Sequence, residues 1–300
     1  MLQYEKEFDP GADASPADDR ADGGSGHAGY ATDEEVYVFD DARLVLAVNI
    51  ALKTRRPLLL FGPPGSGKSS LAPNVARVLG WKHHAHVVTA RTEPEDLLWR
   101  FDALKRLNDA QSKSLREDRH YYTEGPLWRA FAEGNRSGQR CVVLIDEIDK
   151  ADPDLPNSLL GPLGSHSFPL PWDDTEQITV AGEHAPLVVI TTNDERELPR
   201  PFLRRCIVFE LGPPSRDHLL SVARQHLGPH FDGDLAGRLA DHLLHIRATQ
   251  ENAPHGPSTA EFLDALKASH QLGVSPGTPE WTVLEAVTLW KRRDGTERPA

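Results

Sequence analysis

Short apolar runs alternate with longer stretches in which apolar residues recur at helical spacing, from about residue 36 onward. Runs of four or five apolar residues between turn-forming residues are typical of strands that are buried on both faces of a sheet. The alternation of such strands with amphipathic helices predicts an α/β domain with a parallel sheet. Five strands are expected, at residues 57–61, 84–89, 141–145, 187–191 and 206–210.

Two helices are expected around the first strand, at residues 42–52 and 67–79. The second contains Pro73, which costs roughly 3 kcal/mol in a regular helix interior. After the break at Leu211–Pro214 the pattern predicts a small all-α second domain. Its four expected helices span residues 216–227, 232–249, 259–270 and 279–292.

The acidic residues are concentrated near the start of the chain. The formal net charge is -12, and residues 1–35 contain ten acidic residues against Lys6 and Arg20. This segment is rich in Gly, Ala, Asp and Ser, which bury too little apolar area to offset the entropy of ordering. We therefore expect a disordered acidic tail over residues 1–35, with a partner-docking arm as the alternative. The expected domains are then 36–211 and 212–293, followed by a flexible tail at 294–300.

Several classes of protein are disfavoured by composition. The longest apolar runs are far shorter than the ~20 residues of a membrane-spanning helix, and the N-terminus has no basic start or apolar core of a secretory signal. We expect a cytoplasmic protein without a membrane partner. Cys141 and Cys206 are too few for a disulfide framework and are expected to be buried free thiols. Without a basic stripe, nucleic acid is not the expected partner.

A phosphate-binding motif directly follows the first expected strand. The stretch GPPGSGKS fits G-x-x-x-x-G-K-[ST], in which glycines let backbone N–H groups point at phosphate oxygens. Lys68 is expected to reach the β- and γ-phosphates, and Ser69 to offer its hydroxyl to Mg²⁺. A chance Gly-rich turn is the alternative, but the strand before and the helix after argue against it. The candidate nucleotide-binding residues are Gly62, Pro63, Pro64, Gly65, Ser66, Gly67, Lys68, Ser69 and Ser70.

Two adjacent carboxylates end the third expected strand, in the pattern of a Walker B element. We expect Asp146 to hold Mg²⁺ and Glu147 to polarise the attacking water. A solvent-facing acidic strand end explains one carboxylate, but not a pair at a strand terminus in a chain with a phosphate loop. The carboxyl ends of parallel strands are where open α/β sheets bind ligands, so the loop and the pair can converge.

Together with Val189–Asn193, these motifs resemble an AAA+ ATPase module over residues ~36 to ~293. The resemblance implies a P-loop NTPase sheet flanked by helices, followed by a small helical lid. It also implies that Asn193 is the sensor 1 residue, whose amide would hold the water that Glu147 activates. A structural turn asparagine is the alternative.

The stretch Leu198–Cys206 resembles the arginine-finger box of that family. The family pattern makes Arg205 the first candidate and Arg204 the second, because the finger precedes the last strand. Such a cation stabilises charge on the γ-phosphoryl bound to a neighbouring subunit, and it requires an oligomer. A surface salt-bridge pair is the alternative.

Weaker motifs resemble the MoxR-like branch of AAA+ proteins, namely Glu93–Leu98, Glu124–Leu127 and Pro257–Asp264. This resemblance implies a Mg²⁺-dependent ATPase in a homo-oligomeric ring, with a hexamer favoured. It further implies a chaperone that remodels a protein client, with a von Willebrand A domain protein as a partner. The stretch Ser258–Glu261 departs from the family by lacking a sensor 2 arginine, so coupling to the lid would be weaker or carried by another residue.

Two other functions remain open. The missing arginine is compatible with a regulatory switch that binds ATP and hydrolyses it negligibly. A DNA-associated AAA+ motor or loader is the other alternative, which the low basic content disfavours. The histidines at 83, 84 and 86 invite a metal interpretation, but no carboxylate or cysteine lies nearby in the sequence, so we expect a structural role.

Overall fold

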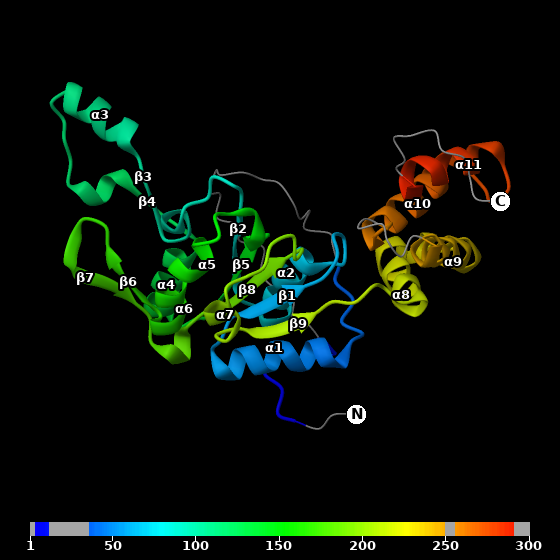
Figure 1. Ribbon diagram of the computed structural model, residues 1–300, viewed down its shortest axis with the longest axis horizontal. Helices are drawn as coiled ribbons and strands as arrows, with labels where there is room; N and C mark the ends of the chain where they lie inside the picture. The colour runs from blue at the N-terminus through cyan, green and yellow to red at the C-terminus, as the bar shows by residue number, and fades with distance from the viewer. Residues whose placement is uncertain (1–3, 12–35, 250–255, 291–300) are drawn as a thin grey trace. The chain divides into compact units, whose positions relative to one another are not determined.

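The computed structural model describes residues 4–11, 36–249 and 256–290, which form two compact units (Figure 1). One unit contains Asp41–Phe61 and Lys68–Glu210, and the other is built from residue 211 onward together with residues 62–67. Each has its own hydrophobic core. Most of the expected acidic tail, and the expected flexible tail at 294–300, lie outside the described residues.

A five-stranded parallel sheet forms the centre of the first unit, in the order β2–β5–β8–β1–β9. The strands are β1 (Leu58–Phe61), β2 (Lys82–Val87), β5 (Cys141–Asp146), β8 (Leu187–Thr192) and β9 (Ile207–Glu210). The predicted fold class is confirmed, and each expected strand lies within two residues of its observed bounds. β5 and β8 are buried along their whole length, as expected of interior strands that helices cover on both faces.

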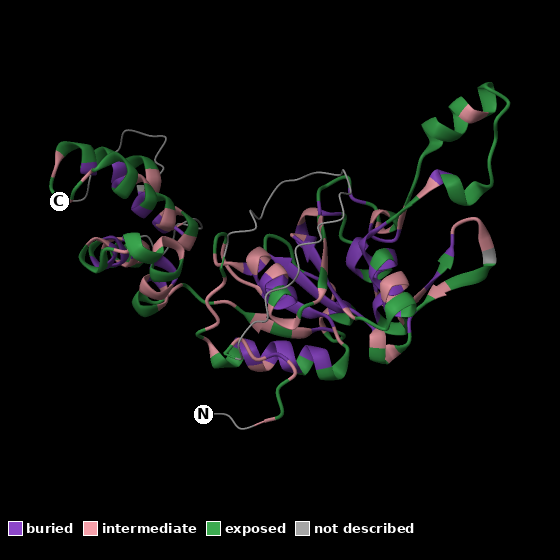
Figure 2. Cartoon of the chain, turned by 180° about the vertical axis from the view of Figure 1, so that it is seen from behind, coloured by how far each residue is buried: buried purple, intermediate pink, exposed green. Residues whose placement is uncertain are grey.

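Helices cover both faces of this sheet. α4 (Pro126–Ser137) packs on one face, where its Leu127 and Phe131 join Val143 of β5 and Val188 of β8 in one core cluster. α1 (Ala42–Thr54) and α2 (Lys68–Leu79) also contact the sheet but contribute nothing to that cluster, so they lie on the other face. Figure 2 shows the buried residues gathered between these layers. Three short helices complete the unit, α5 (Leu155–Ser158), α6 (Leu160–Ser165) and α7 (Arg200–Leu203).

Residues 4–11 are ordered against α1, which differs from the disordered tail expected over 1–35. Phe8 is fully buried. The side-chain oxygen of Asn49 on α1 accepts hydrogen bonds from the backbone N–H groups of Glu7 and Phe8, at 2.8 and 2.9 Å. Its amide nitrogen donates to the carbonyl of Phe8 at 2.8 Å. Phe8 with its buried amide partner Asn49, and the ion pair of Glu7 with Arg140 at 2.7 Å, therefore anchor this stretch, and composition could not reveal these contacts.

An inserted arm and a hairpin interrupt the expected strand and helix pattern. The arm consists of β3 (Trp99–Phe101), α3 (Ala103–Gln111) and β4 (Tyr122–Glu124), and the hairpin of β6 (Ser167–Leu170) and β7 (Asp173–Thr179). α3 extends away from the sheet and none of its residues is buried (Figure 1). The arm is therefore a solvent-exposed insertion between β2 and α4.

Aromatic rings join the base of the arm to the hairpin. Tyr122 of β4 lies 5.1 Å from Trp172 of the hairpin turn, and Trp172 lies 5.7 Å from Trp128 of α4, measured between ring centroids. Phe168 of β6 contacts the rings of Trp99, Trp128 and Phe131. Such contacts each add roughly 0.5–1.5 kcal/mol beyond area burial. The two projecting elements therefore share one packed base.

The second unit is helical. Its helices are α8 (Arg216–Leu227), α9 (Gly233–Thr249), α10 (Thr259–Leu272) and α11 (Pro279–Glu285), with a π-helical turn at Ala286–Trp290. Their apolar faces meet in a core that includes Leu219, Leu239, Phe262 and Trp281. Within the described residues, no helix has both the length and the apolar character needed to cross a bilayer.

β2 lies at one edge of the sheet and carries three half-buried histidines. Burial lowers the pKa of His83 to about 4, and burial also lowers the pKa values of His84 and His86. The Nε2 atom of each is buried without a hydrogen-bond partner. Across the described part of the chain, no cluster of three or more His, Cys, Asp or Glu side chains is arranged to hold a metal ion.

These histidines predict a loss of stability in mild acid. An unfolded histidine titrates near 6.5, whereas His83 in the fold titrates at about 4. Between these values the unfolded chain binds more protons, so the free energy of unfolding falls as the pH drops through this window. We expect His83 to contribute up to about 3 kcal/mol to this fall. Urea denaturation between pH 7 and 4.5 measures it.

The matched variants are His83→Phe, which removes the buried titrating group, and His120→Phe, which makes the same change at an exposed position. The first should flatten the pH dependence, and the second should leave it as in wild type. Equal pH dependence in both variants would assign the acid lability to other groups.

Candidate functional site

The glycine-rich loop at residues 62–67 connects the end of β1 to the start of α2. Gly65 and Gly67 have φ angles of 71° and 85°, in the region that favours glycine. The hydroxyl oxygen of Ser66 is buried without a hydrogen-bond partner. A buried orphan hydroxyl beside two such glycines fits a loop whose polar groups await an anionic ligand. Pro63 and Pro64 precede them in the same loop, and Ser69 and Ser70 follow in the first turn of α2.

Lys68 begins α2 and is only 6% exposed. Burial lowers the pKa of its ammonium group, and the carboxylates of Asp146, Asp149 and Glu147 act in the opposite direction. A buried cation is stabilised by nearby negative charge. The electrostatics around Lys68 therefore favour an added anion such as a phosphate.

Asp146 is the last residue of β5, and its hydrogen bonds join β5 to α2 and β8. Its Oδ1 atom accepts hydrogen bonds from the hydroxyl of Ser69 on α2, at 2.8 Å, and from the hydroxyl of Thr191 on β8, at 2.5 Å. The carboxylate is 8% exposed. Mg²⁺ usually takes one or two protein oxygens and completes its shell with waters and phosphates. The paired oxygens of Ser69 and Asp146 are such a donor set.

Glu147 follows in the left-handed conformation, with φ 59° and ψ 50°. A non-glycine residue held there is strained by about 1–3 kcal/mol and needs support from its surroundings. The Glu147 N–H donates to the Thr191 hydroxyl at 2.9 Å, and the Asn193 amide donates to Oε1 of Glu147 at 3.3 Å. The structure thus brings together Glu147 and Asn193, the two residues expected to hold and activate a water.

Asp149 holds the backbone at and after Asn193 by hydrogen bonds. It is 3% exposed, and its Oδ2 atom accepts from the backbone N–H groups of Asn193 and Glu195, at 3.2 and 3.0 Å. Sequence reasoning gave no role to Asp149 or Thr191. Both lie inside stretches that resemble AAA+ motifs. The sequence feature that could have identified them is a polar side chain in or just after an apolar strand, namely the hydroxyl of Thr191 in β8 and the carboxylate of Asp149 after β5.

Arg204 and Arg205 lie at the other end of the sheet. They precede β9, whose first residue pairs with Leu58 at the start of β1, so they are near the amino ends of these strands. Both side chains are exposed, and Nη1 of Arg205 donates to the carbonyl of Leu160 at 3.1 Å. Neither arginine forms an ion pair with any described residue, so the salt-bridge alternative is not observed. The structure does not place them beside Glu147 and Asn193 of the same chain.

The hydroxyl of Thr191 holds both Asp146 and the Glu147 backbone, so its removal should weaken the site. In Thr191→Val, Asp146 loses a donor and the Glu147 N–H loses its acceptor, so we expect a loss of about 1–3 kcal/mol in the free energy of unfolding. We also expect about tenfold weaker Mg²⁺-dependent binding of a fluorescent ATP analogue, which corresponds to ~1.4 kcal/mol. Thr191→Ser keeps the hydroxyl and should approach wild type in both measurements. If the Val and Ser variants behave alike, the hydroxyl does not hold the site.

Comparison with known proteins gives one family. The AAA domain family, dynein-related subfamily, matches residues 57–206, which is half of the chain. That range contains the phosphate loop, Asp146, Glu147, Asn193 and both arginines.

Curated relatives include several Lon proteases. The Lon protease of Desulforamulus reducens is 29% identical over 195 residues, which cover 60% of this chain and 21% of that protein. The Lon protease of Chloroflexus aggregans is 28% identical over 59% of this chain and 20% of its own length. The peroxisomal Lon protease homolog 2 of Arabidopsis thaliana is 28% identical over 58% of this chain and 18% of its own length.

The matched region thus spans about a fifth of the length of these relatives. The likeness concerns a shared module and not the whole of those proteins. Since the family match covers half of the chain and the parallel sheet has the order β2–β5–β8–β1–β9, the chain belongs to the AAA domain family, in its dynein-related subfamily.

Proposed function

We propose that this chain is a Mg²⁺-dependent ATPase that converts ATP and water to ADP and phosphate. The observation that carries the proposal is the continuous hydrogen-bonded network of Ser69, Asp146, Thr191, Glu147 and Asn193. It joins a candidate metal site to a candidate base. The buried Lys68 supplies positive charge beside it.

Each residue has a distinct role in this proposal. The loop at residues 62–67 and Lys68 bind the phosphates, and Glu147 accepts the proton of a water that the Asn193 amide helps to orient. Ser69 and Asp146 would hold Mg²⁺, which supplies charge neutralisation at the β- and γ-phosphate oxygens when bound. Thr191 keeps the Asp146 carboxylate and the Glu147 backbone in fixed positions.

We further propose that the active form is a homo-oligomeric ring in which Arg205, assisted by Arg204, acts on the nucleotide of a neighbouring subunit. β1 is four residues long, so the phosphate loop and the start of β9 are separated by about 13 Å of strand. The exposed arginines precede β9, at the opposite end of these strands from the phosphate loop. Supply from a neighbour is the arrangement that would complete a site.

The client function is proposed from resemblance to the MoxR-like branch, in which ATP hydrolysis remodels a protein. A von Willebrand A domain protein is the partner class that this resemblance suggests. Adding a purified protein of that class should raise ATP turnover, whereas an unrelated protein of similar size should not. Equal turnover with and without it, at saturating concentration, would reject this partner class.

The ATPase proposal is tested by substitution of the base. Glu147→Gln keeps the size of the side chain but removes the proton acceptor, so kcat should fall by at least about a hundredfold. Nucleotide affinity should be retained in this variant and lost in Lys68→Ala. Glu195→Gln is the matched control, because Glu195 is a nearby exposed carboxylate that pairs with Lys150 at 2.6 Å. Turnover equal to wild type in Glu147→Gln would contradict the assigned role.

A regulatory switch that binds ATP and hydrolyses it negligibly is the second candidate. It is favoured by the start of α10, where Ser258 and Glu261 form a capping box and no basic residue stands. Negligible turnover in wild type, with tight nucleotide binding that Lys68→Ala abolishes, would support the switch and reject the enzyme.

A further inference from the structure

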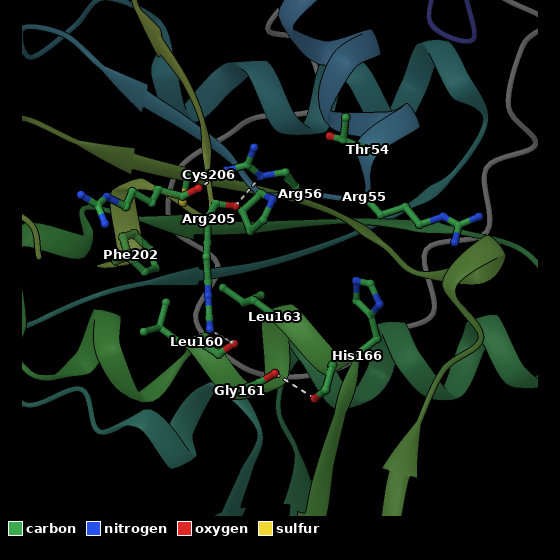
Figure 3. A pocket seen from close by; sticks show the side chains of 14 residues that line it. Thr54, Arg55, Arg56, Leu160, Gly161, Leu163, His166, Phe202, Arg205 and Cys206 are labelled. Carbon is green, nitrogen blue, oxygen red and sulfur yellow. Dashed lines mark hydrogen bonds between the residues drawn. The ribbon is translucent and has the colours of Figure 1, made fainter. Parts of the chain in front are cut away.

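A cavity of about 780 Å³ lies at the amino ends of β1 and β9 (Figure 3). Its walls come from residues 54–57, 160–161, 163–166, 202 and 204–206. None of these lining residues is Asp or Glu, although the chain as a whole carries a net charge of -12. The basic residues among them are Arg55, Arg56, Arg204, Arg205 and His166. The cavity therefore gathers four arginine cations, with the two proposed finger arginines among them.

Arg56 differs from the other arginines of this cavity in what it binds. Its Nε atom donates to the carbonyl oxygen of Arg205 at 3.1 Å, and its Nη2 atom donates to the carbonyl oxygen of Arg204. One guanidinium thus bridges two consecutive carbonyls, using the fixed fork of donors that arginine has and lysine lacks. Figure 3 shows Arg56 pointing at this backbone while Arg55 points away from it.

These two carbonyls help to set the direction of the Arg205 side chain. The carbonyl of Arg204 belongs to the peptide plane before the Arg205 Cα, and the carbonyl of Arg205 belongs to the plane after it. Because each peptide unit is planar, holding both carbonyls fixes both planes and with them the Cα–Cβ bond between them. The backbone N–H groups of Arg205 and Cys206 donate to the carbonyls of Phe202 and Leu203, at 2.9 and 3.1 Å, and hold the opposite edges of the same two planes.

The adjoining backbone makes this clamp rigid. The N–H of Ile207 donates to the carbonyl of Pro57 at 2.8 Å, which extends the β1–β9 pairing to the residue after Arg56. Arg56 is therefore anchored by the central sheet rather than by a surface loop. The far end of Arg205 rests on the Leu160 carbonyl, so the side chain is held at its base and at its tip.

We infer that Arg56 is a positioning residue for the arginine finger, acting on a neighbouring subunit's nucleotide through Arg205. The inference rests on the proposed function, in which Arg205 serves a neighbour's site. Arg56 itself needs no contact with nucleotide. Without Arg56 the chain would still bind ATP, but the Arg205 side chain would be poorly oriented toward the neighbouring nucleotide.

The first test compares substitutions at two arginines of one cavity. Arg56→Ala should lower kcat by about tenfold to a hundredfold, since misplacing a group by ~1 Å can cost 10²-fold. Affinity for a fluorescent ATP analogue should stay within about twofold of wild type, because Arg56 is remote from the phosphate loop. Arg56→Lys should retain only part of the activity, and Arg55→Lys, the matched control, should keep wild-type turnover.

The second test separates positioning of a finger from a defect in the variant's own fold or site. Arg56→Ala subunits are mixed with Glu147→Gln subunits, which lack the base but carry intact fingers. If Arg56 acts through Arg205 on a neighbour, the mixture should turn over ATP faster than the sum of the two separate proteins. Arg205→Ala mixed with Glu147→Gln is the reference and should show the same recovery.

The outcomes separate a failure of the role of Arg56 from a failure of the proposed ATPase function. Recovery with Arg205→Ala but none with Arg56→Ala overturns the role of Arg56 and leaves the shared site intact. Wild-type turnover in Arg56→Ala also overturns it. Full turnover in Arg205→Ala, or no turnover in wild type, refutes the proposed shared ATPase itself.

Discussion

One carboxylate oxygen links the candidate site to the fold. Oδ1 of Asp146 accepts from the hydroxyls of Ser69 and Thr191, which come from α2 and β8. This meeting is possible because β8 lies between β5 and β1 in the sheet and all three strands run parallel, so their carboxyl ends share one edge. The same hydroxyl of Thr191 also accepts a hydrogen bond from the backbone N–H of Glu147 and so holds that backbone in place. The start of α2, the carboxylate pair and Asn193 are thus joined by one short chain of hydrogen bonds.

The chemistry differs between the carboxyl ends and the amino ends of the strands in this sheet. Its carboxyl edge carries Lys68, Asp146, Glu147 and Asn193, where a buried cation lies among carboxylates. Its amino edge carries a cavity lined by arginines and no acid. Because parallel strands have all their amino ends on one side, the fold separates these two groups within the chain. The proposed function, which needs both groups, would therefore draw them from two chains.

The sequence allowed the interior strands β5, β8 and β1 to be predicted, because strands buried on both faces are nearly continuous apolar runs such as CVVLI. The edge strands β2 and β9 are only partly buried and were predicted with bounds shifted by up to two residues. The phosphate loop, Asp146, Glu147 and Asn193 were predicted because their motifs are local. Thr191, Asp149 and Arg56 were missed, since each acts through a hydrogen bond to a residue more than 40 positions away. The burial of Phe8 against Asn49 and the packing of the arm on the hairpin depend on tertiary contacts in the same way.

The aromatic base shared by the arm and the hairpin has a spectroscopic consequence. Three of the six tryptophans of the chain, Trp99, Trp128 and Trp172, meet there around Phe168 and Tyr122. Indole rings at a centroid distance of 5.7 Å interact strongly enough to shape near-ultraviolet absorption and emission. The protein therefore carries an intrinsic optical probe at the shared base of the arm and the hairpin, and a change in the packing there can be followed without any attached dye.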